Sequence, residues 1–154
     1  MALRDIVKDG STILRKKCRE VESFDDKLGK LLDDMHETMK HADGVGLAGP
    51  QVGIARRIAV VEVGETYLEM VNPVIVAASG SQIGQEACLS VPSKSCMVER
   101  PMNVTVAYLD RRGEKREGSY TGLTARACCH EIDHLDGVLF YDKEYRGGYR
   151  RADK

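Results

Sequence analysis

Near its C-terminal end the chain contains the pattern His-Glu-x-x-His, as His130-Glu131-Ile132-Asp133-His134. On an α-helix this spacing places both imidazoles on one face about one turn apart, so they can bind the same metal ion. Glu131 points to a different side of the helix from His130 and can act as a base on water without becoming a ligand. The pattern is typical of zinc hydrolases, which combine two histidine ligands with a general base. A helix with incidental histidines is the alternative.

The remaining periodicity predicts an α+β fold. Residues 123–135 have a helical period, with Leu123, Ala127, His130 and His134 on one face. Residues 25–42 form a second expected helix, with Asp25 as its N-cap and an apolar face that is expected to be core. Short stretches rich in β-branched residues predict strands at 54–63, 67–78, 81–87, 95–100, 103–110 and 115–121.

Because the strands are grouped and the helices lie outside them, we expect antiparallel β-sheets packed around a central helix carrying His-Glu-x-x-His, with an N-terminal helix. Residues 1–24 are expected to be an irregular arm. The whole chain, 1–154, is expected to be a single domain, with a flexible tail from about 143 to 154.

Charge and cysteine content exclude several classes of protein. The chain has 23 Lys and Arg against 24 Asp and Glu, a net charge of -1, so no direct nucleic-acid site is expected. No run approaches the roughly 18 apolar residues that span a membrane, and the first residues lack a signal-peptide core. Five cysteines, two of them adjacent, do not suit a disulfide framework. These features predict a cytoplasmic protein with reduced thiols.

A hydrolytic metal site needs a third protein ligand, and the residues after His134 offer a poor choice. No histidine follows it, and Glu144 is the only glutamate there. Cys88, at the end of a predicted strand and before a proline turn, is the better candidate, because a thiolate binds zinc and ferrous iron strongly. Other thiols compete by chemistry alone: those of Cys18, Cys96, Cys128 and Cys129.

A glycine-rich stretch, 43–53, separates the first predicted helix from the strands. Glycines at this density allow positive φ angles or close approach to a ligand, although a plain connection is an alternative. A phosphate-binding loop is excluded, because no Lys-Ser/Thr pair follows.

Three segments together resemble the peptide deformylase family. Its motifs G-x-G-L-A-A-x-Q, E-G-C-L-S and H-E-x-D-H correspond here, in the same order, to residues 44–51, 86–90 and 130–134. The segment Leu135–Phe140 is also similar, and the resemblance runs from about residue 1 to 142. Two motif positions depart from the family pattern: Gly49 stands in place of Ala, and Ala87 in place of Gly. Cys129 occupies a position that is often Gln.

The resemblance implies a metal-dependent hydrolase that removes the formyl group from N-formylmethionyl peptides and releases formate. Cys88, His130 and His134 would hold one divalent metal ion. Ferrous iron is the implied metal in the cell, and zinc, nickel or cobalt can substitute. Transient contact with the ribosome is also implied, although no long basic helix indicates a strong anchor.

The resemblance also implies roles for further residues. Glu131 would be the general base, and the Leu89 backbone N–H and Gln51 amide would stabilise the oxyanion. Val45, Gly46 and Ala87 would bind substrate, with Leu123 and Ala127 as further candidates for the methionine pocket. Glu86 and Asp133 would orient the ligating histidines or, alternatively, pair with Arg100 or Arg126.

The departures raise two concerns and keep two rival functions open. Ala87 would strain the backbone if its position required a positive φ, and Gly49 is expected to loosen the loop before Gln51. One rival is a metallopeptidase, which lacks its downstream ligand here. The other is a degenerate relative that binds peptide or metal without turnover.

Overall fold

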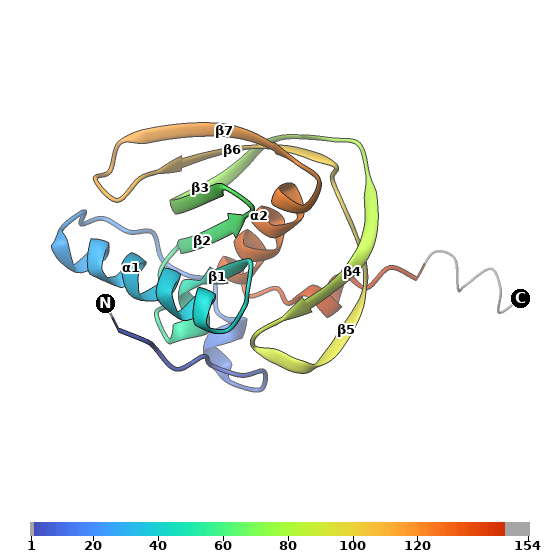
Figure 1. Ribbon diagram of the computed structural model, residues 1–154, viewed down its shortest axis with the longest axis horizontal. Helices are drawn as coiled ribbons and strands as arrows, with labels where there is room; N and C mark the ends of the chain where they lie inside the picture. The colour runs from blue at the N-terminus through green and yellow to red at the C-terminus, as the bar shows by residue number, and fades with distance from the viewer. Residues whose placement is uncertain (1, 147–154) are drawn as a thin grey trace, which may run out of the picture.

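The computed structural model describes residues 2–146, and most of its strands belong to one antiparallel sheet (Figure 1). This sheet has the order β1-β2-β3-β6-β7. Its strands are β1 (Gly46–Ala48), β2 (Ile58–Val63), β3 (Thr66–Ser79), β6 (Asn103–Leu109) and β7 (Lys115–Thr121). A separate two-stranded antiparallel sheet contains β4 (Gln82–Cys88) and β5 (Val91–Arg100). The α+β class with antiparallel sheets is therefore confirmed.

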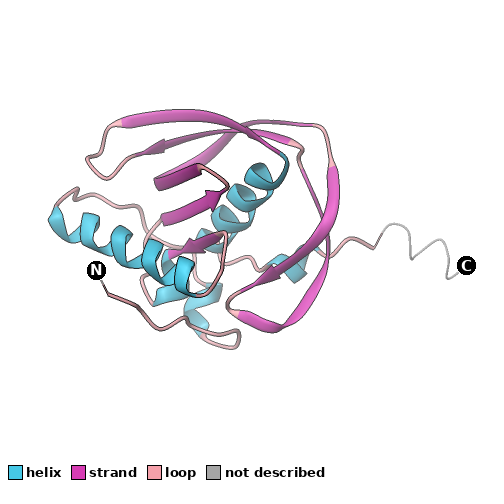
Figure 2. Ribbon diagram, in the orientation of Figure 1, coloured by secondary structure: helices cyan, strands magenta, loops and turns pink. Residues whose placement is uncertain are grey.

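The two α-helices pack on opposite faces of the large sheet at β1 and β2 (Figure 2). α1 (Asp26–His41) begins after Asp25, whose side chain accepts a hydrogen bond from the Leu28 backbone N–H. Along β2, Ile58 and Val60 join the apolar cluster of α1, whereas Ala59 and Val61 join that of α2. This alternation follows from the two-residue period of a strand, so both faces of β2 are buried.

α2 (Gly122–Leu135) carries the His-Glu-x-x-His motif and has two contrasting sides. Its apolar side packs under the large sheet and includes Cys128, Ile132 and Leu135. Its other side faces the small sheet, where Arg126 and His130 both contact Glu86 of β4. The helix therefore joins an apolar core to a polar interface.

Strand boundaries differ from the prediction in three places. β2 begins at Ile58, not at residue 54. β5 begins at Val91, not at residue 95, and part of the glycine-rich stretch forms β1 followed by a 3-10 turn at Gly49–Val52. Leu47 and Ala48 are fully buried and pair with Val60 and Ala59. Short side chains let this strand fit between the two helices, a packing effect that sequence periodicity does not reveal.

The C-terminal part of the described chain lies against β5. Further 3-10 turns occur at Thr12–Arg15 and Phe140–Lys143. Beyond the second, Glu144 forms a bridge with Val98, and the Tyr145 backbone N–H donates to Met97 O at 2.6 Å. The rest of the predicted tail, 147–154, lies outside the described residues. Among residues 2–146, no helix is long and apolar enough to cross a membrane.

Candidate metal centre and active site

Three buried side chains from two elements meet at one point. Cys88 is the last residue of β4, and His130 and His134 lie on the polar side of α2. Their potential ligand atoms all lie within 4.8 Å of one another. Cys88 Sγ is 3.4 Å from His134 Nε2. One thiolate and two imidazoles suit a divalent metal ion of the zinc or ferrous type, with further positions left for water or substrate.

Glu86 fixes the orientation of His130. Its Oε1 lies 2.9 Å from His130 Nδ1, so the ionised carboxylate accepts a hydrogen bond from the N–H at that nitrogen. The other nitrogen, Nε2, is then the one available to a metal ion. His134 differs, because its buried Nδ1 has no hydrogen-bond partner within residues 2–146.

The two histidines also differ in protonation. Burial lowers the pKa of His134 to about 3, which leaves a neutral imidazole. Burial also lowers the pKa of His130, but the neighbouring groups Cys88, Glu131 and Glu86 outweigh it and raise that pKa above its ordinary value. Because a metal ion binds a neutral imidazole, its binding to His130 would release the extra proton of that ring, whereas His134 would lose none.

Glu131 lies beside the ligand group and is buried. It is 4% exposed, and its Oε1 has no hydrogen-bond partner among residues 2–146. Burial raises the pKa of Glu131 to about 7, close to the range that suits a general base at neutral pH. A Cβ at Gly46 would lie 2.5 Å from Glu131 Oε2, so only glycine leaves room for this carboxylate.

Gln51 directs its side-chain amide toward the same point. The Ala48 backbone N–H donates to Gln51 Oε1 at 2.9 Å. Gln51 Nε2 donates to Ser90 Oγ at 3.1 Å and lies 3.5 Å from Cys88 Sγ. Ser90 is the last residue of the Glu86–Ser90 motif, but no pattern in the sequence predicted this contact with Gln51.

The N-terminal arm supports this part of the site, which the sequence analysis also missed. The Val7 backbone N–H donates to Gln51 O at 2.7 Å, and the Asp9 N–H donates to Ser90 O at 2.8 Å. Farther back, Ala2 N–H and Arg4 bind Asp34 of α1. These contacts join segments that are distant in the sequence, and the irregular arm carries no sequence signal for them.

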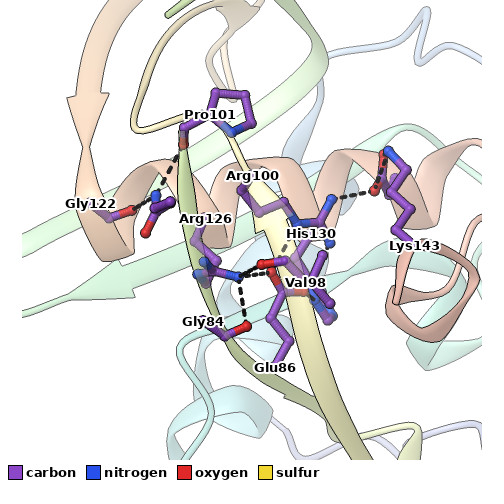
Figure 3. Close-up of polar contacts among 11 residues, drawn as sticks. Gly84, Glu86, Val98, Arg100, Pro101, Gly122, Arg126, His130 and Lys143 are labelled. Carbon is purple, nitrogen blue, oxygen red and sulfur yellow. Dashed lines mark hydrogen bonds and ion pairs between the residues drawn. The ribbon is translucent and has the colours of Figure 1, made fainter. Parts of the chain in front are cut away.

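A buried cluster of charges surrounds Glu86 (Figure 3). Arg100 donates to both Glu86 oxygens at 2.8 and 2.9 Å, and Arg126 donates to Oε2 at 2.6 Å. Burial raises the pKa of Glu86, but Arg100 and His130 outweigh this and hold it below the ordinary range. Asp133 forms ion pairs with Arg100 and Lys143, which is one of its two expected roles.

A pocket of about 440 Å³ is lined by Gln51, Glu86, Cys88, His130 and Glu131. Its lining includes the expected substrate-binding residues and oxyanion donor: Val45, Gly46, Ala87, Leu89, Leu123 and Ala127. Val45 and Leu123 are exposed apolar side chains at this pocket. Of the other sequence candidates, Cys128 and Cys129 are buried in the apolar core, away from the ligand group. Nothing in the structure explains a cysteine at position 129.

The two departures from the family motifs are accommodated. Ala87 lies in β4, and among residues 2–146 only Asp43 and Asn72 combine a side chain with a positive φ. Ala87 therefore does not carry the backbone strain that a positive φ would have caused. Gly49 allows close packing, because a Cβ there would lie 2.8 Å from both Ile54 O and Arg56 O.

Comparisons with known proteins agree on one family. A family model described as polypeptide deformylase matches residues 3–147. A peptide deformylase of Alkaliphilus metalliredigens is 53% identical over 143 residues, covering 93% of this chain and 97% of the relative. The crystal structure of peptide deformylase from Thermotoga maritima has a TM-score of 0.92 and 40% identity, covering 94% of this chain and 99% of that one. A class I type b peptide deformylase from Acinetobacter baumannii, solved with Met-Ala-Ser bound, has a TM-score of 0.88 and 36% identity, covering 92% and 98%.

Proposed function

Since the chain belongs to the polypeptide deformylase family and is a hydrolase that removes the N-formyl group from nascent peptides, we propose which of its residues carry out this reaction. Cys88, His130 and His134 hold one divalent metal ion. The observation that carries the proposal is the convergence of these three ligands within 4.8 Å, together with the buried carboxylate of Glu131, which lines the same pocket as Cys88 and His130.

A bound divalent ion supplies Lewis acidity, which lowers the pKa of water and polarises a carbonyl. Glu131 accepts a proton from the attacking water and later transfers it to the departing amine. Gln51 Nε2 and the Leu89 backbone N–H donate hydrogen bonds to the formyl oxygen as negative charge develops on it. The products are formate and a peptide with a free N-terminus, a step of N-terminal processing in protein biosynthesis.

Gln51→Ala tests the oxyanion role. Loss of one such donor is expected to reduce kcat by about 10²–10³-fold, because the amide contributes most in the transition state. Metal content should stay at the wild-type level, since Gln51 is not a ligand, and elemental analysis checks this. Near-normal turnover would remove Gln51 from the mechanism.

The pocket also supports a substrate-binding arrangement. Val45, Leu123 and Ala127 offer apolar surface for the methionine side chain, and the backbones of Gly46 and Ala87 lie where a peptide can be held. A formyl carbon bears only hydrogen, so a tight site beside Glu131, against which Gly46 packs closely, would admit it and exclude bulkier acyl groups. Acetyl-Met-Ala-Ser should therefore be a much poorer substrate than formyl-Met-Ala-Ser; equal rates would contradict this arrangement.

We propose ferrous iron as the metal in the cell, with zinc, nickel or cobalt able to substitute at a thiolate and two imidazoles. Anaerobic purification, elemental analysis and an assay on formyl-Met-Ala-Ser test this. Iron-loaded protein should be active and lose activity in air. Full, air-stable activity in zinc-loaded protein alone would contradict it.

The substrate suggests a cytoplasmic location and a transient ribosome contact. All five cysteines are free thiols, as expected in a reducing compartment. Co-sedimentation with ribosomes should be weak and disappear as salt is raised, because no strong anchor is expected. Stable, salt-resistant association would contradict a transient contact.

A further inference from the structure

Arg126 joins the catalytic helix to the small sheet. It lies on α2 one turn before His130, and its side chain is 8% exposed. Its Nη1 donates to Glu86 Oε2 at 2.6 Å, to Val98 O at 3.1 Å and to Gly84 O at 3.4 Å (Figure 3). One guanidinium therefore connects α2 to both strands of that sheet.

Arg126 occupies the Glu86 oxygen that does not face the metal ligand. Oε2 accepts from Arg126 and from Arg100 Nε, whereas Oε1 accepts from Arg100 Nη2 and from His130 Nδ1. Arg100, which lies on β5, donates to both oxygens and by itself fixes the plane of the carboxylate. Arg126 ties the same carboxylate to the helix that carries His130, so it fixes the separation between Glu86 and that histidine.

Gly84 makes room for this contact. A Cβ at position 84 would lie 3.0 Å from Arg126 Nη2 and 3.3 Å from its Cζ. The guanidinium is buried and hydrogen-bonded, so it cannot move aside as freely as an exposed arginine. Gly84 and Arg126 thus form a matched pair across the interface of β4 and α2.

We propose that Arg126 is a positioning residue that acts through Glu86 on His130 and thereby sets the affinity of the metal centre. The inference rests on the proposed metal site. Partners of metal-ligating histidines commonly change metal affinity by about 10–100-fold when they are altered. Because Arg126 also lines the pocket, a direct contact with substrate is the competing role.

Metal affinity of the metal-free protein separates these roles without any turnover measurement. We expect Arg126→Met to raise the Zn²⁺ dissociation constant, measured by chelator competition, about tenfold. Arg126→Lys, which keeps the charge, should restore part of this loss. The Co²⁺ absorption spectrum should also change in Arg126→Met, because the His130 ring is less well fixed. Unchanged affinity with a higher KM for formyl-Met-Ala-Ser would overturn the proposal in favour of substrate contact.

A double-variant cycle tests whether the effect passes through Glu86. In a Glu86→Gln background, Arg126→Met should change the Zn²⁺ dissociation constant by less than about twofold. A full tenfold effect in that background would show that Arg126 acts by another route. Gly84→Ala, made with Glu86 unchanged, tests the same link. It should weaken Zn²⁺ binding, as Arg126→Met does, and wild-type affinity would count against the proposal.

The matched control is Arg111→Met. Arg111 binds Glu69 and Asp33 and does not line the pocket, so its loss should lower thermal stability and leave Zn²⁺ affinity unchanged. If Arg111→Met weakens Zn²⁺ binding as much as Arg126→Met, the effect is general destabilisation and the proposal fails. If wild type and Cys88→Ala bind Zn²⁺ equally weakly, the proposed metal site itself fails, a distinct result.

Discussion

The two sides of α2 differ in what they contribute. On the side of the large sheet, fully or nearly buried apolar groups such as Leu135 and Cys128 pack against strand residues. On the side of the small sheet, Arg126 and His130 meet Glu86 in a buried cluster of charges. Burial of apolar area stabilises a fold, whereas a buried ion cluster adds little net stability because desolvation offsets it. The apolar side should therefore maintain the fold, and the polar side the chemistry.

Glu131→Gln should produce the largest effect and should be confined to chemistry. Loss of the general base is expected to lower kcat by about 10²–10⁴-fold. The variant should bind metal and unfold at a temperature close to that of the wild type, because the amide is nearly isosteric. Elemental analysis and thermal unfolding serve as controls, and a wild-type kcat would exclude Glu131 as the base.

Leu135→Ala, four residues further along the same helix, should have the opposite pattern: it should lower stability and leave catalysis unchanged. Leu135 is fully buried, and its truncation is expected to lower the free energy of unfolding by about 2–5 kcal/mol. Formate release per folded, metal-loaded molecule should be unchanged. Denaturant unfolding and a steady-state assay measure the two quantities, and a large fall in kcat with little loss of stability would break the comparison.

Ala87→Gly should have only a small effect on stability and on catalysis. A glycine in a strand is expected to cost about 0.5–1 kcal/mol, and KM for formyl-Met-Ala-Ser should not change, because Ala87 has no strained φ to relieve. Urea unfolding and KM provide the measurements. A marked drop in KM would mean that the alanine methyl obstructs the peptide.

Asp34→Asn concerns neither side of α2 and should have the smallest effect. Burial raises the pKa of Asp34, but hydrogen bonds from the Ala2 backbone N–H and Arg4 outweigh it, so the pKa is lowered. A lowered folded-state pKa contributes stability above the unfolded value of about 3.9 and loses it as pH falls through the folded value. The stability difference between wild type and Asp34→Asn should therefore be present at pH 7 and shrink below about pH 4. A difference that is constant with pH, measured by thermal unfolding, would contradict this.

Sequence alone predicted the elements better than the contacts between them. Periodicity gave both helices and most strand positions, because each depends on local spacing, and the metal ligands followed from motifs. His130, Arg100 and Arg126 were named as alternative partners of Glu86, but only the fold shows that Glu86 binds all three at once. The role of Gly46 was likewise hidden, since it depends on the approach of Glu131 from a distant helix.

Formate release from formyl-Met-Ala-Ser, measured anaerobically per equivalent of bound metal, tests the central claim most directly. All of this activity is predicted to depend on one metal ion, held by Cys88 and by His130 and His134 on the polar side of α2. Chelation should abolish formate release, ferrous iron should restore it, and Cys88→Ala protein should neither retain the metal nor release formate. Undiminished release by metal-free protein or by Cys88→Ala protein would contradict the account.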